Sequence, residues 1–231
     1  MTSLSTGKCS RDWGKTALLR SPAGGGSGGW ASPGQQPAPT DPTPPAPEDP
    51  AFNDVSPNAW YADYVASVAT AGLFQGTAPG IFSPQGTMTR AMFAQVFANL
   101  EDADTSGFTV SRFNDVLATA WYLRAVEWAA HTEIVQGVGG GNFAPNAPIT
   151  REQMAVILYR YAMIMDISLP QYNESAFTDQ DSISPWAVDA VRAIQSAGIV
   201  TGRPDGRFDP RATATRAEVA AIFARFLELL N

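Results

Sequence analysis

Apolar side chains recur every three or four positions in short segments between residues 51 and 231, the spacing of a helix with one buried face. Two shorter stripes are Tyr61, Tyr64, Val65 and Val68, and then Val188, Val191 and Ile194. Three longer stripes are Phe93, Val96, Phe97 and Leu100; Met154, Ile157, Leu158 and Tyr161; and Val219, Ile222, Phe223, Phe226, Leu227 and Leu230. The pattern predicts an all-α fold.

The predicted helices belong to three copies of one motif, whose leading residues are Phe52, Phe113 and Phe177. In each copy a Trp, a Gly, a Phe-x-Pro and a Thr-Arg pair follow the leading Phe in the same order. The third copy carries a single insertion near Ser182–Ser184. This agreement predicts a tandem repeat rather than chance similarity.

Each copy is predicted to form a helix, a Gly-rich loop and a second helix. Gly72 and Gly198 are expected to end the first helices of repeats one and three. Ser184 is expected to be the N-cap of the first helix of repeat three. One such hairpin is too small to bury its own apolar face. We therefore expect residues 51–231 to form one pseudo-threefold helical domain. Its repeats span residues 52–105, 113–167 and 177–230.

Residues 1–50 have a different composition. Nine of the 18 prolines lie between Pro22 and Pro50, with six glycines between Gly24 and Gly34. The segment has little to bury, so a disordered leader and Gly/Pro-rich linker is predicted in preference to a ligand of SH3-type domains. Residues 1–20 lack the apolar core of a secretory signal. We favour a true start upstream, in a longer exported protein with a cargo domain before the linker, over unconventional export or a truncated, silent copy.

Composition excludes several kinds of chemistry. The single cysteine, Cys9, permits neither an intrachain disulfide nor a cysteine zinc site, and the single histidine, His131, rules out a two-histidine metal site. The net charge of −7 argues against a nucleic-acid partner, and no apolar run is long enough to insert into a membrane. We expect no catalytic residues, no metal and no cofactor.

The motifs resemble the S-layer homology (SLH) module. The third copy, GIVTGRPDGRFDPRATATRAE (Gly198–Glu218), is the most similar to the family pattern. The resemblance implies a three-lobed spindle around a central helical bundle. It also implies non-covalent attachment to secondary cell-wall polysaccharide, commonly acidic and pyruvylated, at the surface of a bacterium. The glycan would lie in grooves between adjacent repeats.

The Thr-Arg pairs have both a structural and a binding interpretation. Thr150 with Gln153 and Thr215 with Glu218 have the spacing of a capping box, whereas Thr89 lacks the reciprocal residue. Capping does not account for the arginine beside each Thr. Beside free N–H groups at a helix start, an arginine forms a good carboxylate site. We favour this role over an ion pair with a nearby Asp for Arg90, Arg151 and Arg216.

Aromatic and loop residues complete the predicted binding set. The motif tryptophans are Trp60, Trp121 and Trp186. For each of them we favour packing in the core over stacking on a sugar, although both interpretations remain open. Asp205 lies at the tip of the third loop, in the turn sequence Gly202–Gly206, and is a further candidate ligand. The first two loops lack this acid.

The leading hypothesis is a cell-surface anchoring module without enzymatic activity. A fragment of an enzyme acting on cell-wall glycan is one alternative, because carboxylates are plentiful enough for an acid/base pair. An intracellular helical scaffold for a partner protein is another, motivated by the missing signal. No acidic pair recurs in a way that singles out a catalytic site, which disfavours the enzyme.

Overall fold

The computed structural model describes residues 52–172 and 175–230. The predicted leader and linker, residues 1–50, lie outside the described residues. The described part is helical and contains no strand, only isolated β-bridges. Its elements are α1 (Ala62–Thr70), α2 (Arg90–Leu100), α3 (Leu123–His131), α4 (Arg151–Ile164), the 3-10 helix η1 (Gln180–Ser182), α5 (Val188–Ser196) and α6 (Arg216–Leu230). The all-α prediction is confirmed.

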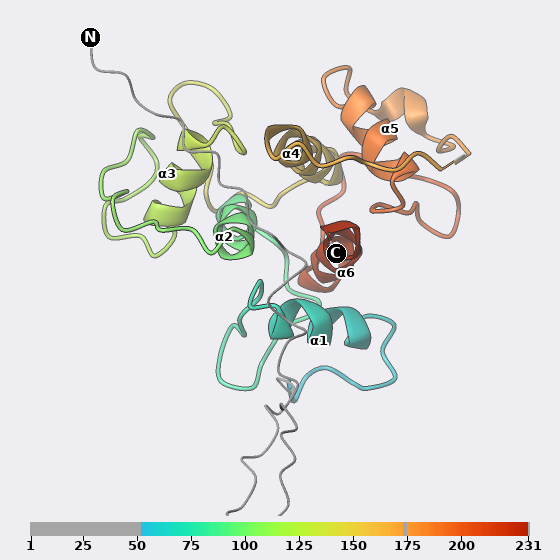
Figure 1. Ribbon diagram of the computed structural model, residues 1–231, viewed down its shortest axis with the longest axis horizontal. Helices are drawn as coiled ribbons and strands as arrows, with labels where there is room; N and C mark the ends of the chain where they lie inside the picture. Colours follow the sequence, from blue (N-terminus) through green and yellow to red (C-terminus); the bar gives the residue numbers. More distant parts are fainter. Residues whose placement is uncertain (1–51, 173–174, 231) are drawn as a thin grey trace, which may run out of the picture. The chain divides into compact units, whose positions relative to one another are not determined.

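The second helices of the three repeats, α2, α4 and α6, lie side by side (Figure 1). The ring of Phe97 lies 4.9 Å from that of Tyr161 and 5.3 Å from that of Phe223, and Tyr161 in turn lies 5.6 Å from Phe226. All four side chains are fully buried. The three longer apolar stripes therefore meet in one shared core, as one hairpin alone could not achieve.

Each first helix packs against the second helix of the preceding repeat. Helix α3 packs on α2, and α5 packs on α4. The third such contact links the two ends of the repeat series, because the guanidinium of Arg225 in α6 lies 5.3 Å from the ring of Tyr64 in α1. The repeats thus form a closed cycle rather than an open row.

Short backbone pairings join the segments just before the second helices. Isolated bridges connect Thr89 with Pro148, Thr150 with Thr213, and Thr87 with Thr215. Each repeat therefore pairs with both of the others, which makes the domain one structural unit.

The second helices begin where the Thr-Arg pairs predict. The Thr150 side chain and the Gln153 side chain form a complete capping box, while Thr89 accepts only from the N–H of Met92. Thr215 and Glu218 also form a complete capping box: the N–H of Glu218 donates to the Thr215 hydroxyl, and the N–H of Thr215 donates to the Glu218 carboxylate. All three capping predictions are confirmed.

The predicted cap at Ser184 is wrong. Helix α5 begins at Val188, and Ser184 instead donates its backbone N–H and its hydroxyl to the buried carboxylate of Glu152 in α4. A carboxylate enclosed by the fold is a stronger acceptor than solvent, so this contact between repeats determines where Ser184 lies.

The first helices end at one left-handed residue. Gly72 and Gly198 have φ of 73° and 71°, which confirms the predicted stops. Repeat two has Glu133 at the same place, with φ of 63°. Because a side chain is disfavoured in this conformation, the second stop carries strain that the other two avoid.

Glu133→Gly is therefore expected to raise the free energy of unfolding by about 0.5–1 kcal/mol, measured by urea denaturation. Gly72→Ala is the matched reverse change, because a Cβ at Gly72 meets no atom within 4 Å and only the backbone conformation is affected. It should lower stability by about 1 kcal/mol. Equal stability of Glu133→Gly and the parent chain would contradict this account.

Candidate functional site

The three motif arginines are buried and bind the Phe-x-Pro loop of another repeat. Only 6%, 6% and 7% of Arg90, Arg151 and Arg216 is exposed. Each Nε donates to the carbonyl oxygen of a loop phenylalanine: Arg90 to Phe143 at 2.9 Å, Arg151 to Phe208 at 2.6 Å, and Arg216 to Phe82 at 2.7 Å. Repeat one binds repeat two, two binds three, and three binds one. The arginines close the cycle of repeats.

Further contacts strengthen this arrangement. The Nη2 groups of Arg90 and Arg216 donate to the carbonyl oxygens of Gln136 and Gln75, both at 2.8 Å. The guanidinium of Arg216 also lies 4.7 Å from the centre of the Phe82 ring, within the range of a cation–π interaction. Burial lowers the pKa of Arg90 and Arg216, although arginine stays charged throughout the physiological range.

The N–H groups at the starts of the second helices, which we expected to be free beside the arginines, are occupied. The backbone N–H of Arg90 donates to the carbonyl of Ala147 at 3.0 Å, and that of Ala91 donates to Pro145 at 3.1 Å. The N–H groups of Arg151 and Arg216 are occupied in the same way. The loop of a neighbouring repeat, rather than an anion, satisfies these donors.

The alternative ion pairs are also absent among residues 52–172 and 175–230, since Asp54, Asp115 and Asp179 hold backbone instead. The Asp54 carboxylate accepts from the N–H of Phe82 at 2.8 Å and of Ser83 at 2.7 Å, where Ser83 has a φ of 58°. Asp115 and Asp179 bind their own loops identically. The aspartates thus fix the loops whose carbonyls receive the arginines.

The same contacts perturb the acidity of these groups. Burial alone would raise the pKa of Asp54, but hydrogen bonds from Phe82 and Ser83, assisted by the charge of Arg216, hold that pKa below its ordinary value. The pKa of Asp115 is lowered for the same reasons, with Phe143, Ala144 and Arg90 as the partners.

The motif tryptophans are exposed, so the preference for core packing is wrong. The exposed fractions of Trp60, Trp121 and Trp186 are 61%, 63% and 57%. Trp60 and Trp121 each contact the ring of the following tyrosine edge to face, at 5.4 and 5.3 Å. The rings therefore offer apolar faces to solvent, as a surface that stacks on sugar would require.

One cavity brings two of the predicted residues together. We call it the Trp121 groove, with a volume of about 520 Å³. Polar and aromatic side chains from all three repeats line it, among them Gln75, Gln95, Asn99, Trp121 and Arg216. A groove with one exposed aromatic ring, several amides and a guanidinium can bind a polyhydroxylated ligand with an acidic substituent.

The amides in this groove are held in place. Asn99 donates to the carbonyl of Leu73 at 2.9 Å, and Gln95 donates to the Asn99 oxygen at 2.8 Å. The repeat motif did not predict these residues, because Asn99 stands where Arg160 and Arg225 stand in the other repeats. The signal available in the sequence was this departure from the repeat.

The corresponding positions elsewhere are more cationic. Arg160 and Arg225 approach the carbonyls of Ile134 and Ile199 at 3.4 and 3.5 Å, in the way that Asn99 approaches Leu73. In repeat three, Arg203 also forms an ion pair with Glu218 at 3.3 Å. The three repeats therefore differ in side-chain chemistry at equivalent positions although the backbone repeats.

Asp205 is exposed and is not among the residues that line the Trp121 groove. Its carboxylate accepts from the Nε of Arg207 at 2.7 Å and from the Arg207 backbone N–H at 3.2 Å. Hydrogen bonding to Arg207 lowers the pKa of Asp205. Its visible role is to shape the third loop.

This geometry defines a class of protein: a helical module of three cyclically connected repeats with a groove between them. The S-layer homology domain model matches residues 51–94, 112–155 and 176–220. The chain belongs to the S-layer homology domain family, and the predicted three tandem copies are confirmed.

Several long bacterial proteins contain a similar segment. The chain is 36% identical over 78% of its length to an amylopullulanase of Thermoanaerobacterium thermosulfurigenes, and 35% identical over 78% to the exoglucanase XynX of Acetivibrio thermocellus. It spans only 10% and 16% of those two relatives. A cellulosome-anchoring protein of Acetivibrio thermocellus is 31% identical over 68% of this chain, which covers 36% of that protein.

No helix in the described ranges combines the length and the apolar character that crossing a membrane requires.

Proposed function

We propose that this chain anchors a bacterial surface protein to the cell wall by binding acidic, pyruvylated secondary cell-wall polysaccharide between its repeats. Membership of the S-layer homology family and similarity to a cellulosome-anchoring protein support anchoring rather than catalysis. The chain covers only a small part of the length of these two relatives. This supports a role as one module attached to a cargo domain. The proposed location is the cell surface.

The observation that carries this proposal is the Trp121 groove. The exposed Trp121 ring would stack on the apolar face of a sugar, and the amides of Gln75 and Gln95 would bind its hydroxyl groups. The guanidinium of Arg216 lines the same cavity and would face a carboxylate. Arg216 would then serve both the fold and the ligand.

The other predicted residues have equivalent places in the proposal. By the repeat symmetry, Trp186 with Arg90 and Trp60 with Arg151 would serve the second and third inter-repeat surfaces. The exposed carboxylate of Asp205 would accept from a sugar hydroxyl at the third loop.

Sedimentation with purified wall sacculi tests the proposal. Trp121→Ala should weaken binding about tenfold. A nucleic-acid base stacked on an aromatic side chain contributes on the order of 1–3 kcal/mol, and we expect a sugar ring on Trp121 to contribute a similar amount. Met163→Ala is the matched control, since Met163 is also exposed, at 62%, but does not line the groove. It should bind as the parent chain does.

A second arm tests the polymer itself. Binding should be lost when the secondary polysaccharide is chemically stripped from the sacculi. Equal sedimentation before and after stripping would refute the proposed ligand. Normal binding by Trp121→Ala together with loss in Trp60→Ala or Trp186→Ala would move the site to another inter-repeat surface.

A further inference from the structure

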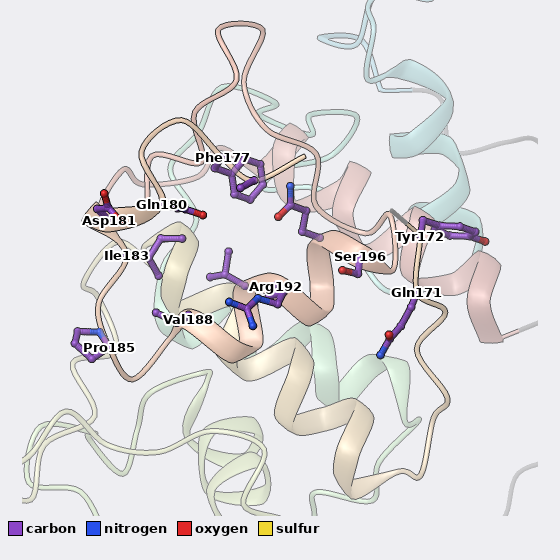
Figure 2. A pocket seen from close by; sticks show the side chains of 13 residues that line it. Gln171, Tyr172, Phe177, Gln180, Asp181, Ile183, Pro185, Val188, Arg192 and Ser196 are labelled. Atoms are coloured by element: carbon purple, nitrogen blue, oxygen red, sulfur yellow. The ribbon is translucent and has the colours of Figure 1, made fainter. Parts of the chain in front are cut away.

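Repeat three contains a second cavity, of about 770 Å³, that the Trp121 groove does not include. It lies between helix α5 and the chain around Phe177. Figure 2 shows Phe177 and Arg192 across the cavity from one another, with Ile183 at its side. Gln180, Val188, Val191 and Gln195 also line the cavity.

In repeat two the equivalent sequence positions hold an internal ion pair. Counting from the motif Trp, Glu127 occupies the position of Arg192; counting from the leading Phe, Arg112 occupies that of Ala176. Glu127 is only 2% exposed, and the Nε of Arg112 lies 2.9 Å from its carboxylate. The Ser111 hydroxyl also donates to Glu127, at 2.8 Å. Here the chain supplies both the anion and the cation.

Repeat three has lost this pairing and reversed its charge. Ala176 lacks the long side chain that Arg112 has in repeat two, and Arg192 stands where the carboxylate of Glu127 stands. Arg192 forms no hydrogen bond or ion pair with any residue in the described ranges, although Asp181 lines the same cavity. Arg192 is exposed, so the result is a cavity open to solvent with a cation at its edge that is free of protein partners among the described residues.

The remaining walls suit a compact polar organic molecule. Ile183, Val188 and Val191 supply an apolar surface, and the Gln195 amide is oriented by a bond from its Nε2 to the carbonyl of Ser175 at 2.9 Å. This bond leaves the Gln195 oxygen as an acceptor. The volume falls within the range of small-molecule sites, roughly 300–1,000 Å³.

We propose that this cavity binds a single acidic sugar unit, with its carboxylate on Arg192 and its hydroxyl groups on Gln180 and Gln195. In repeat two the anion is on the helix and the cation, Arg112, comes from the chain before the motif Phe; here Arg192 supplies the cation and the ligand supplies the anion. The apolar wall contacts the CH groups of the sugar ring. This site is independent of the Trp121 groove and of binding to the wall.

Titration of the full chain with glucuronic acid, followed by amide NMR shifts, tests the proposal. Saturable shifts are expected along α5 and at Gln180. Arg192→Gln should weaken the interaction more than tenfold, whereas Arg124→Gln, a change at an exposed arginine on α3, should leave it unchanged. Binding of glucose or inorganic phosphate as tight as that of glucuronic acid would overturn the proposal, as would unchanged affinity in Arg192→Gln.

A second variant fills the cavity. Ala176→Arg combined with Arg192→Glu transfers the Arg112–Glu127 arrangement of repeat two into repeat three. The double variant should keep its helical circular dichroism and lose glucuronic acid binding. Retained binding by the folded double variant would also overturn the proposal.

Discussion

Arg216→Ala is expected to lower the free energy of unfolding by about 3 kcal/mol or more, because a hydrogen bond from a charged group contributes about 1.5–3 kcal/mol. The substitution removes two such bonds, to the carbonyl oxygens of Phe82 and Gln75, and leaves both oxygens without their donor. These bonds connect repeat three to repeat one. Urea denaturation followed by circular dichroism measures the loss.

Two further variants separate the contact from the charge. Arg216→Lys keeps the charge but loses the planar fork that reaches both carbonyls, so it should recover only part of the stability. Arg124→Ala removes an exposed arginine and should change stability by less than about 0.5 kcal/mol. A loss below about 1 kcal/mol in Arg216→Ala would show that this arginine does not close the cycle of repeats.

Phe223→Ala is expected to lower stability by about 3–5 kcal/mol, the usual cost of truncating a buried phenylalanine. Its side chain is fully buried, and its ring lies 5.4 Å from that of Phe93 and 5.3 Å from that of Phe97. It also contacts Phe74 at 6.2 Å. One residue of repeat three therefore packs against three rings of repeat one.

Because the core is shared, Phe223→Ala should shift a single cooperative transition rather than unfold repeat three alone. Tryptophan fluorescence and circular dichroism should report the same midpoint, since Trp60, Trp121 and Trp186 lie in different repeats. Leu117→Ala, at a position 67% exposed, is the control and should be nearly neutral. Separate transitions for the two probes would contradict a shared core.

Binding tests must take the structural arginines into account. Alanine at Arg90, Arg151 or Arg216 removes contacts between repeats, so lost binding would not distinguish a missing ligand contact from a loosened fold. Trp121→Ala is the sharper test of the groove, because its indole is 63% exposed and its removal opens no buried space.

The pattern of residues was sufficient for the helices and their ends. Capping by Thr150 and Thr215, and the stops at Gly72 and Gly198, involve groups only a few residues apart, so local sequence determines them. The cap predicted at Ser184 failed because Glu152, from another repeat, competes for the same side chain. A local rule cannot include a partner that the fold brings from elsewhere.

The sequence by itself determined that this protein has three helix–loop–helix repeats, where each helix lies, and which family the chain resembles. Only the tertiary structure decided which groups the motif arginines bind, because the carbonyls that accept from Arg90, Arg151 and Arg216 lie 53, 57 and 134 residues away. It also decided that the motif tryptophans face solvent and that Trp121 and Arg216 share one groove. The reason is physical: capping and helical periodicity act within one or two turns, whereas burial and groove chemistry depend on which repeats the closed cycle makes neighbours.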